Sequence, residues 1–143
     1  MKGFVIDTSV AVKWAVPEPG WEKARRLLAS NIRRIAPDLI YTEIVSALRG
    51  KLRPADGSLT PDEAFRALRL LLRVPINIEP ASHYAHETLE ASLLLDCPVY
   101  DPTFLVLAIA RRCKLVTADR IFYERVEATS LHKHITLLDD MRE

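Results

Sequence analysis

The chain lacks the residue patterns that build zinc, redox and disulfide sites. It has two cysteines among 143 residues, Cys97 and Cys113, and they are isolated rather than arranged as CxxC. Its four histidines form two pairs that are distant in sequence, with no third ligand nearby. We therefore interpret the histidines as surface or capping residues, and neither a zinc site nor a thiol redox motif is indicated.

Long apolar runs and side-chain amides are scarce as well. No apolar run approaches the roughly 20 residues of a membrane-spanning helix, and Asp7 ends the first apolar run too early for a signal peptide. A cytoplasmic protein without a membrane anchor is therefore expected. The chain has no Gln and two Asn against nine Pro, a usage that resembles thermophile proteins.

Charge of neither sign dominates. The net charge is +1, so any binding of nucleic acid must depend on local patches. Arginine supplies 14 of the 20 basic residues and occurs in three adjacent pairs, Arg25-Arg26, Arg33-Arg34 and Arg111-Arg112. Arg forms bidentate contacts with phosphate, so such pairs either bind phosphate or lie on solvated helix faces.

The hydrophobic residues, 49% of the chain, form short strands that alternate with helices. Strands are predicted at 4–6, 35–36, 76–78, 115–117 and 135–137. Helices are predicted at 10–16, 21–30, 38–52, 60–73, 82–95, 101–112 and 119–128, with a loop at 51–59 and N-caps that include Asp7, Thr60, Ser82 and Asp101. The pattern predicts one domain over residues 1–143, an α/β sandwich in which helices cover both faces of a parallel sheet.

Two acids occupy positions where the helical pattern favours apolar residues. Glu43 falls in the apolar stripe that is formed by Ile40, Ile44, Ala47 and Leu48. Asp101 heads a similar stripe that continues through Phe104, Leu105 and Ala108. A lone buried carboxylate is costly, so it is usually paired or bound to a cation.

Two further acids follow predicted strands. Asp7 comes directly after the strand at 4–6, and Asp119 closely follows the strand at 115–117. In an open parallel sheet, the carboxyl ends of the strands form the site where ligands bind. We therefore expect both carboxylates at one rim of the sheet.

Each acid also has an ordinary explanation: Asp7, Asp101 and Asp119 can serve as helix N-caps, and Glu43 can pair with an arginine. Together they exceed what capping requires. Carboxylates about 4 Å apart repel by about 1 kcal/mol in water and about 4 kcal/mol at an effective dielectric near 20, unless a cation binds. Oxygen ligands without Cys or His favour Mg²⁺ or Mn²⁺, and such a site suits phosphodiester hydrolysis.

The acids and their neighbours resemble a known family. The order Val5-Ile6-Asp7-Thr8-Ser9, then Glu43 in a helix, then Tyr100-Asp101, then Leu115-Val116-Thr117-Ala118-Asp119 is similar to that of PIN-domain ribonucleases. The size and spacing resemble in particular the VapC-like toxins of type II toxin–antitoxin modules. The resemblance covers essentially the whole chain, and four motifs in this order are a fairly specific signal.

The resemblance implies an α/β/α sandwich with a central five-stranded parallel sheet and acids at the strand carboxyl ends. It also implies Mg²⁺- or Mn²⁺-dependent endoribonuclease activity on RNA, usually by a homodimer that a small antitoxin protein inhibits. A water activated by the metal would attack phosphorus in line and expel the 3′ oxygen.

Residue by residue, the resemblance makes Asp7 and Asp101 the principal metal ligands. Glu43 and Asp119 would complete the site, directly or through water. Two hydroxyl residues, Ser9 and Thr117, match positions that often support the acids by hydrogen bonds.

Other interpretations remain open. A phosphoaspartyl phosphatase typically has a second Asp two residues after its nucleophile, where this chain has Ser9. A receiver domain has an acid pair beside its phosphoacceptor, which is missing after the strand at 4–6. A third alternative is a non-catalytic PIN-like module that binds RNA or protein. Because the chain has all four acids, the nuclease is favoured over the non-catalytic module. Titration with Mn²⁺ distinguishes these two interpretations, because only a protein with a metal site gains melting temperature.

Overall fold

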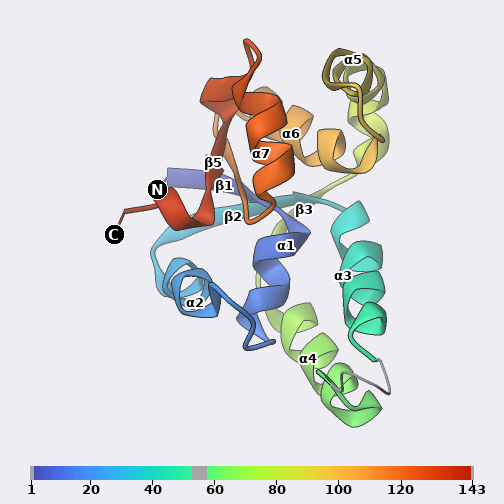
Figure 1. The fold of residues 1–143 in the computed structure, drawn as a ribbon, viewed down its shortest axis with the longest axis vertical. Coiled ribbons are helices and arrows are strands. Elements are labelled where there is room, and N and C mark those ends of the chain that lie inside the picture. Colours follow the sequence, from blue (N-terminus) through green and yellow to red (C-terminus); the bar gives the residue numbers. More distant parts are fainter. Residues whose placement is uncertain (1, 53–57, 143) are drawn as a thin grey trace.

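The computed structural model describes residues 2–52 and 58–142. Within these residues, five strands form one parallel sheet in the order β3-β2-β1-β4-β5 (Figure 1). The strands are β1 (Lys2–Ile6), β2 (Ile32–Pro37), β3 (Asn77–Glu79), β4 (Lys114–Thr117) and β5 (Ile135–Leu137). The prediction of an α/β fold with a five-stranded parallel sheet is confirmed.

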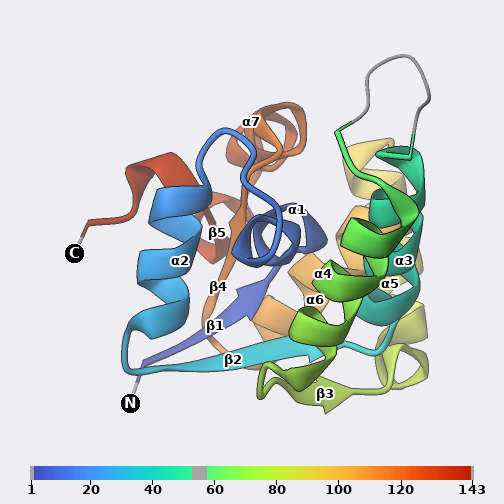
Figure 2. The ribbon, with the colours of Figure 1, turned by 90° about the horizontal axis from the view of Figure 1, so that it is seen from below.

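Helices cover both faces of the sheet, as predicted (Figures 1 and 2). One face carries α1 (Thr8–Ala11), α2 (Trp21–Ala29), α3 (Leu39–Gly50) and α4 (Pro61–Arg73). The other carries α5 (Ala85–Leu95), α6 (Tyr100–Ala110) and α7 (Arg120–Glu127). Short 3₁₀ turns are η1 (Val12–Trp14), η2 (Ala81–Tyr84), η3 (His132–His134) and η4 (Leu138–Asp140).

The strand order changes direction at the centre of the sheet. From β1 the chain adds β2 and then β3 on one side, and it returns to place β4 and β5 on the other side. Ligands of open α/β sheets bind at such a reversal, outside the carboxyl ends of the strands. Ile6 pairs with Val116, so β1 and β4 end side by side at this point.

The core is centred on α6, which packs against β1, β2 and β4. Every residue from Pro102 to Ala108 is buried, because a helix that is apolar on all sides belongs in the interior. This packing holds the first turn of α6 beside the ends of the central strands. Among the described helices, none is by itself long and apolar enough to cross a membrane, and only Ala81–Leu95 and Tyr100–Ala110 together, bent by 117°, meet the length and composition criteria.

Two element boundaries differ from the prediction near the chain start. Helix α1 begins at Thr8, because Asp7 itself is the N-cap, and it continues as η1 only to Trp14. Strand β2 begins at Ile32 rather than 35, because Ile32 pairs with Lys2 of β1. The parallel neighbour therefore extends a strand that its own sequence indicates only weakly.

The predicted helix caps have different outcomes. Thr60 is confirmed as the N-cap of α4, in a capping box with Glu63. The prediction of Ser82 as a cap is wrong, because Ser82 lies inside η2 and α5 begins at Ala85. The loop predicted at 51–59 is described only at its two ends, and residues 53–57 lie outside the described residues.

Candidate metal centre

Asp7 stands at the carboxyl end of β1 and caps α1. Its side chain accepts hydrogen bonds from the backbone N–H of Ser9 at 3.3 Å, from the Ser9 hydroxyl, and from the Thr117 hydroxyl at 3.1 Å. The residue is only 6% exposed. Burial raises the pKa of Asp7, the hydrogen bonds lower it, and the negative charge of Asp119 raises it further.

Ser9 and Thr117 join the ends of β1 and β4 around Asp7. Their hydroxyl oxygens lie 3.4 Å apart, and Ser9 Oγ also accepts a hydrogen bond from the backbone N–H of Ala118 at 3.0 Å. Thr117 Oγ1 accepts one from the backbone N–H of Asp119 at 3.0 Å. The two hydroxyls that the sequence singled out therefore connect the acids that follow β1 and β4.

Asp119 follows β4 and caps α7. Its Oδ1 accepts a hydrogen bond from the backbone N–H of Phe122 at 3.0 Å. This helix cap is the ordinary explanation that the sequence offered for Asp119, and the structure contains it. Capping nevertheless places the Asp119 carboxylate close enough to Asp7 and Asp101 to raise the pKa of both.

Glu43 approaches Asp7 from α3. Thr8 Oγ1 donates a hydrogen bond to Glu43 Oε1 at 2.9 Å, which connects α3 to the first residue of α1. Burial raises the pKa of Glu43, the hydrogen bond from Thr8 lowers it, and the charge of Asp7 raises it. Thr8 was missed by the sequence reasoning. The signal that could have found it is a polar residue directly after a strand-ending Asp, in the same motif.

Asp101 lies in the first turn of α6 and is not its N-cap. The prediction of a cap is wrong, because α6 begins at Tyr100 and the carbonyl of Val99 already accepts the backbone N–H of Thr103. Asp101 follows another helix rather than a strand. The pKa of Asp101 is raised to about 7, first by burial and then by the negative charges of Asp7, Asp119 and Glu43. Capping therefore does not account for Asp101.

The acids converge from four separate elements, and Asp101 is close enough to feel the charge of each of the others. Within residues 2–52 and 58–142, no three His, Cys, Asp or Glu side chains are arranged so that they could hold a metal ion as they stand. Mg²⁺ keeps several waters and binds through one or two carboxylates plus substrate phosphates, so an incomplete oxygen shell fits it better than Zn²⁺.

Comparison with known proteins identifies the class. Residues 4–128 match the family model of the PIN domain, and the chain therefore belongs to the PIN domain family. The structure is similar to a chain in the crystal structure of VapBC2 from Rickettsia felis bound to a DNA fragment from their promoter. The TM-score is 0.61 at 15% identity, over 94% of this chain and 98% of that chain, which shows a shared fold. No curated protein matches the sequence significantly.

Proposed function

We propose that this PIN-domain protein is a divalent-metal-dependent endoribonuclease that hydrolyses RNA phosphodiester bonds. The observation that carries the proposal is the convergence of carboxylates beside the ends of the two central strands. Burial and mutual repulsion raise the pKa of three of them, Asp7, Glu43 and Asp101. Carboxylates in this condition are stabilised by a cation, and the ligand set favours Mg²⁺ or Mn²⁺.

Asp7 and Asp101 are the principal metal ligands in this proposal. Asp7 is the most buried of the four acids. Asp101 is the acid whose pKa is raised by the charges of all three others. Glu43 and Asp119 complete the site, directly or through water. A divalent cation bound there supplies the positive charge that polarises a phosphate and favours deprotonation of a water.

Hydroxyl side chains orient the carboxylates. Ser9 and Thr117 both donate to Oδ2 of Asp7, and this fixes the direction of the carboxylate. Thr8 holds Glu43 in the same way from α1. Orientation of ligands by such partners typically changes metal affinity by about 10- to 100-fold.

An unstacked RNA strand is the substrate that this surface suits. Tyr100, which is 57% exposed, directly precedes Asp101 and offers an aromatic ring on which a base can stack. Single-stranded RNA can present its bases and backbone to recessed groups, whereas a duplex cannot.

We further propose that the protein is a toxin, that it acts in the cytoplasm as a homodimer, and that a small antitoxin inhibits it. The fold shared with a chain of VapBC2 supports this assignment. Exposed apolar side chains on α4 and α5, such as Phe65 at 62% and Leu93 at 75%, are suited to protein interfaces.

The test is cleavage of single-stranded RNA in the presence of Mg²⁺ or Mn²⁺, with and without a chelator. Asp101→Asn removes one charge without altering the shape of the side chain or a helix cap, so we expect loss of cleavage with the fold intact. Asp62→Asn on α4 is the matched control, because Asp62 is exposed and lies outside the acid cluster. A protein that neither cleaves RNA nor gains melting temperature with Mn²⁺ is a non-catalytic binding module.

A further inference from the structure

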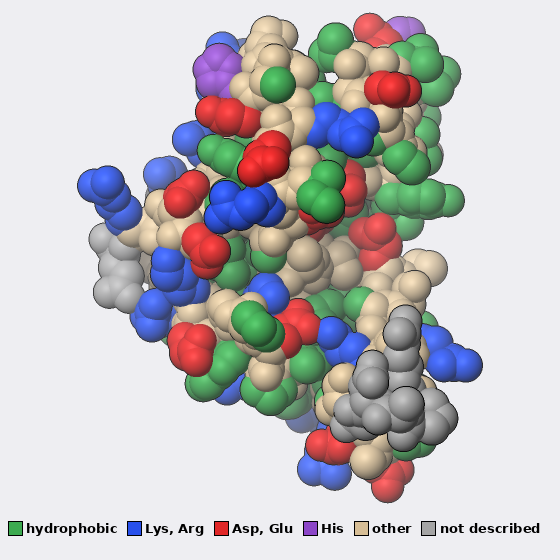
Figure 3. Space-filling model, viewed as in Figure 1, with side chains coloured by type: hydrophobic (Ala, Val, Ile, Leu, Met, Phe, Trp, Pro, Cys, Tyr) green, Lys and Arg blue, Asp and Glu red, His purple; other side chains and the backbone are tan. Residues whose placement is uncertain are grey.

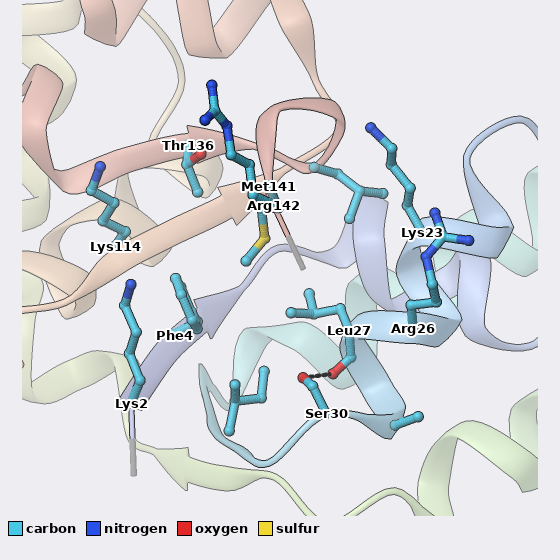
Figure 4. A pocket seen from close by; sticks show the side chains of 13 residues that line it. Lys2, Phe4, Lys23, Arg26, Leu27, Ser30, Lys114, Thr136, Met141 and Arg142 are labelled. Carbon is cyan, nitrogen blue, oxygen red and sulfur yellow. Dashed lines mark hydrogen bonds between the residues drawn. The ribbon is translucent and has the colours of Figure 1, made fainter.

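A cavity of about 730 Å³ lies at the amino-terminal edge of the sheet, beside α2. Figure 4 shows the amino groups of Lys2 and Lys114, from the starts of β1 and β4, on one side of this cavity. Lys23 and Arg26 of α2 lie on the opposite side, and Arg142 extends between the two pairs. Basic side chains therefore surround the cavity, and its floor is apolar.

A second cavity of about 600 Å³ adjoins the first and shares Lys2 and Lys114 with it. Further basic residues from β2, the end of α6 and η3 line it, namely Arg33, Arg111, Arg112 and Lys133. Arg111 also forms an ion pair with Glu79. The two cavities together are called the basic groove below, and they follow the edge of the sheet around the strand starts.

The basic groove is strongly positive although the chain as a whole is nearly neutral. Nine different Lys and Arg residues line it, out of 20 in a chain whose net charge is only +1. None of the described residues that line either cavity is an Asp or Glu. Figure 3 shows Lys and Arg side chains along the edge of the molecule where Figure 1 places the two termini. A hollow lined by charges of one sign concentrates its potential and attracts polyanions.

We propose that the basic groove binds the phosphate backbone of single-stranded RNA without regard to base sequence. Its nine cations exceed what a single phosphate group needs. Phe4 is only 5% exposed at its floor, so the groove offers cations rather than an aromatic surface for stacking bases. The choice of RNA among polyanions rests on the proposed function.

The basic groove and the acids lie at opposite ends of β1. Lys2 is at the start of this strand and Asp7 directly follows its end, a separation of about 16 Å at about 3.3 Å per residue. A trinucleotide at the acid cluster does not reach the basic groove, whereas a longer RNA that passes around the sheet contacts both. The groove therefore contributes to the binding of long substrates only.

The experiment measures binding separately from cleavage. Fluorescence anisotropy of a labelled 20-nucleotide poly(U), in chelator and over a range of salt concentrations, compares the wild type with Lys2→Ala/Lys114→Ala. Both lysines are exposed, so the double variant keeps the fold. We expect weaker binding, and a slope of log affinity against log salt that is smaller by about 1.4, because each lost contact in a single strand contributes about 0.7.

The matched control is Arg66→Ala/Arg69→Ala, which removes two exposed cations of α4 outside the basic groove and leaves binding unchanged. We call Lys2→Ala/Lys114→Ala the groove variant. With Mn²⁺ at low salt, we expect its kcat/KM to be roughly tenfold below that of the wild type for a long RNA and equal to it for a trinucleotide. Equal affinity for single-stranded DNA supports contacts with phosphate.

Unchanged affinity and salt slope in the groove variant overturn the proposal, as does binding of duplex DNA or an acidic polypeptide in preference to single-stranded RNA. Failure of the nuclease assignment gives a different result: the wild type binds poly(U) through the groove in chelator, yet no RNA is cleaved with Mn²⁺. If long RNA is cleaved equally well without Lys2 and Lys114, the proposal for the basic groove is contradicted and the nuclease assignment is not.

Discussion

Burial of the Asp101 carboxylate, together with repulsion from the other acids, predicts that Asp101→Asn stabilises the metal-free protein. The pKa of Asp101 is raised from 3.8 to about 7 in the folded state. At about 1.4 kcal/mol for each tenfold change in proton affinity, this difference sets an upper limit of about 4 kcal/mol. Asp101 is partly exposed, so solvent screening reduces the effect, and we expect about 1–2 kcal/mol more stability for the variant at pH 8.

The same pKa fixes the sign of the pH dependence. Because the pKa of Asp101 is higher in the folded state, the folded protein binds more protons than the unfolded chain between about pH 4 and 7. The stability of the metal-free wild type therefore falls as pH rises through this window and levels off above it. Asp101→Asn lacks this contribution, so its advantage nearly vanishes at about pH 4 and is complete above about pH 7.

Urea denaturation in chelator at pH 4, 6 and 8 measures both effects, with Asp62→Asn as the control. Addition of Mn²⁺ reverses the order, because a ligand at about 100 times its Kd stabilises the folded wild type by about 2.7 kcal/mol. Asp101→Asn gains less from the ion. An Asp101→Asn variant that is less stable than the wild type at pH 8 in chelator would show that burial and repulsion do not destabilise the Asp101 carboxylate.

Two further predictions concern the hydroxyl support of the acids and the composition. Thr117→Val removes a hydrogen-bond donor to Asp7 and raises the pKa of that carboxyl further. We therefore expect Mn²⁺ binding at pH 7 to weaken and its pH profile to shift upward. The control is Thr103→Val, because Thr103 is a buried Thr whose hydroxyl donates to the Val99 carbonyl, and this variant leaves the affinity and the profile unchanged. An unshifted profile for Thr117→Val contradicts the role of the hydroxyl. The absence of Gln and the scarcity of Asn predict a melting temperature above about 65 °C by calorimetry, and a lower value counts against the thermophile interpretation.

The fold and the positions of the four acids could be predicted from local patterns. Asp7 directly follows one apolar strand, and Asp119 lies two residues after the end of another. Parallel pairing of these two strands brings the acids together. Glu43 and Asp101 could be recognised because each occupies a position in an apolar helix stripe. These signals are local in sequence, and the sheet converts them into proximity.

Other features depend on contacts that no local pattern encodes. Asp101-Pro102 is typical of a helix start, yet α6 begins earlier because the carbonyl of Val99 accepts the N–H of Thr103. The partner of Glu43 is likewise the hydroxyl of Thr8, from a distant part of the chain, rather than an arginine. Such assignments require the packed arrangement of α1, α3 and α6.

The arginine pairs show the same limit. In the pairs Arg25-Arg26 and Arg33-Arg34, one member lines the basic groove and the other does not, because neighbouring residues point in different directions. Arg26 lines the groove, whereas Arg25 stacks on Trp21. On β2, Arg33 lines the groove and Arg34 donates to backbone carbonyls instead, since successive strand residues alternate between faces.

In the proposed function, the four acids bind a divalent cation with which the protein cleaves RNA. The most direct measurement is the rate of cleavage of a single-stranded RNA by the wild type and by Asp101→Asn, each with Mn²⁺ and with chelator. We expect cleavage by the wild type with Mn²⁺, none in chelator, and none by the variant, whose circular dichroism spectrum matches that of the wild type. Undiminished metal-dependent cleavage by Asp101→Asn, or cleavage by the wild type in chelator, would contradict the proposed function.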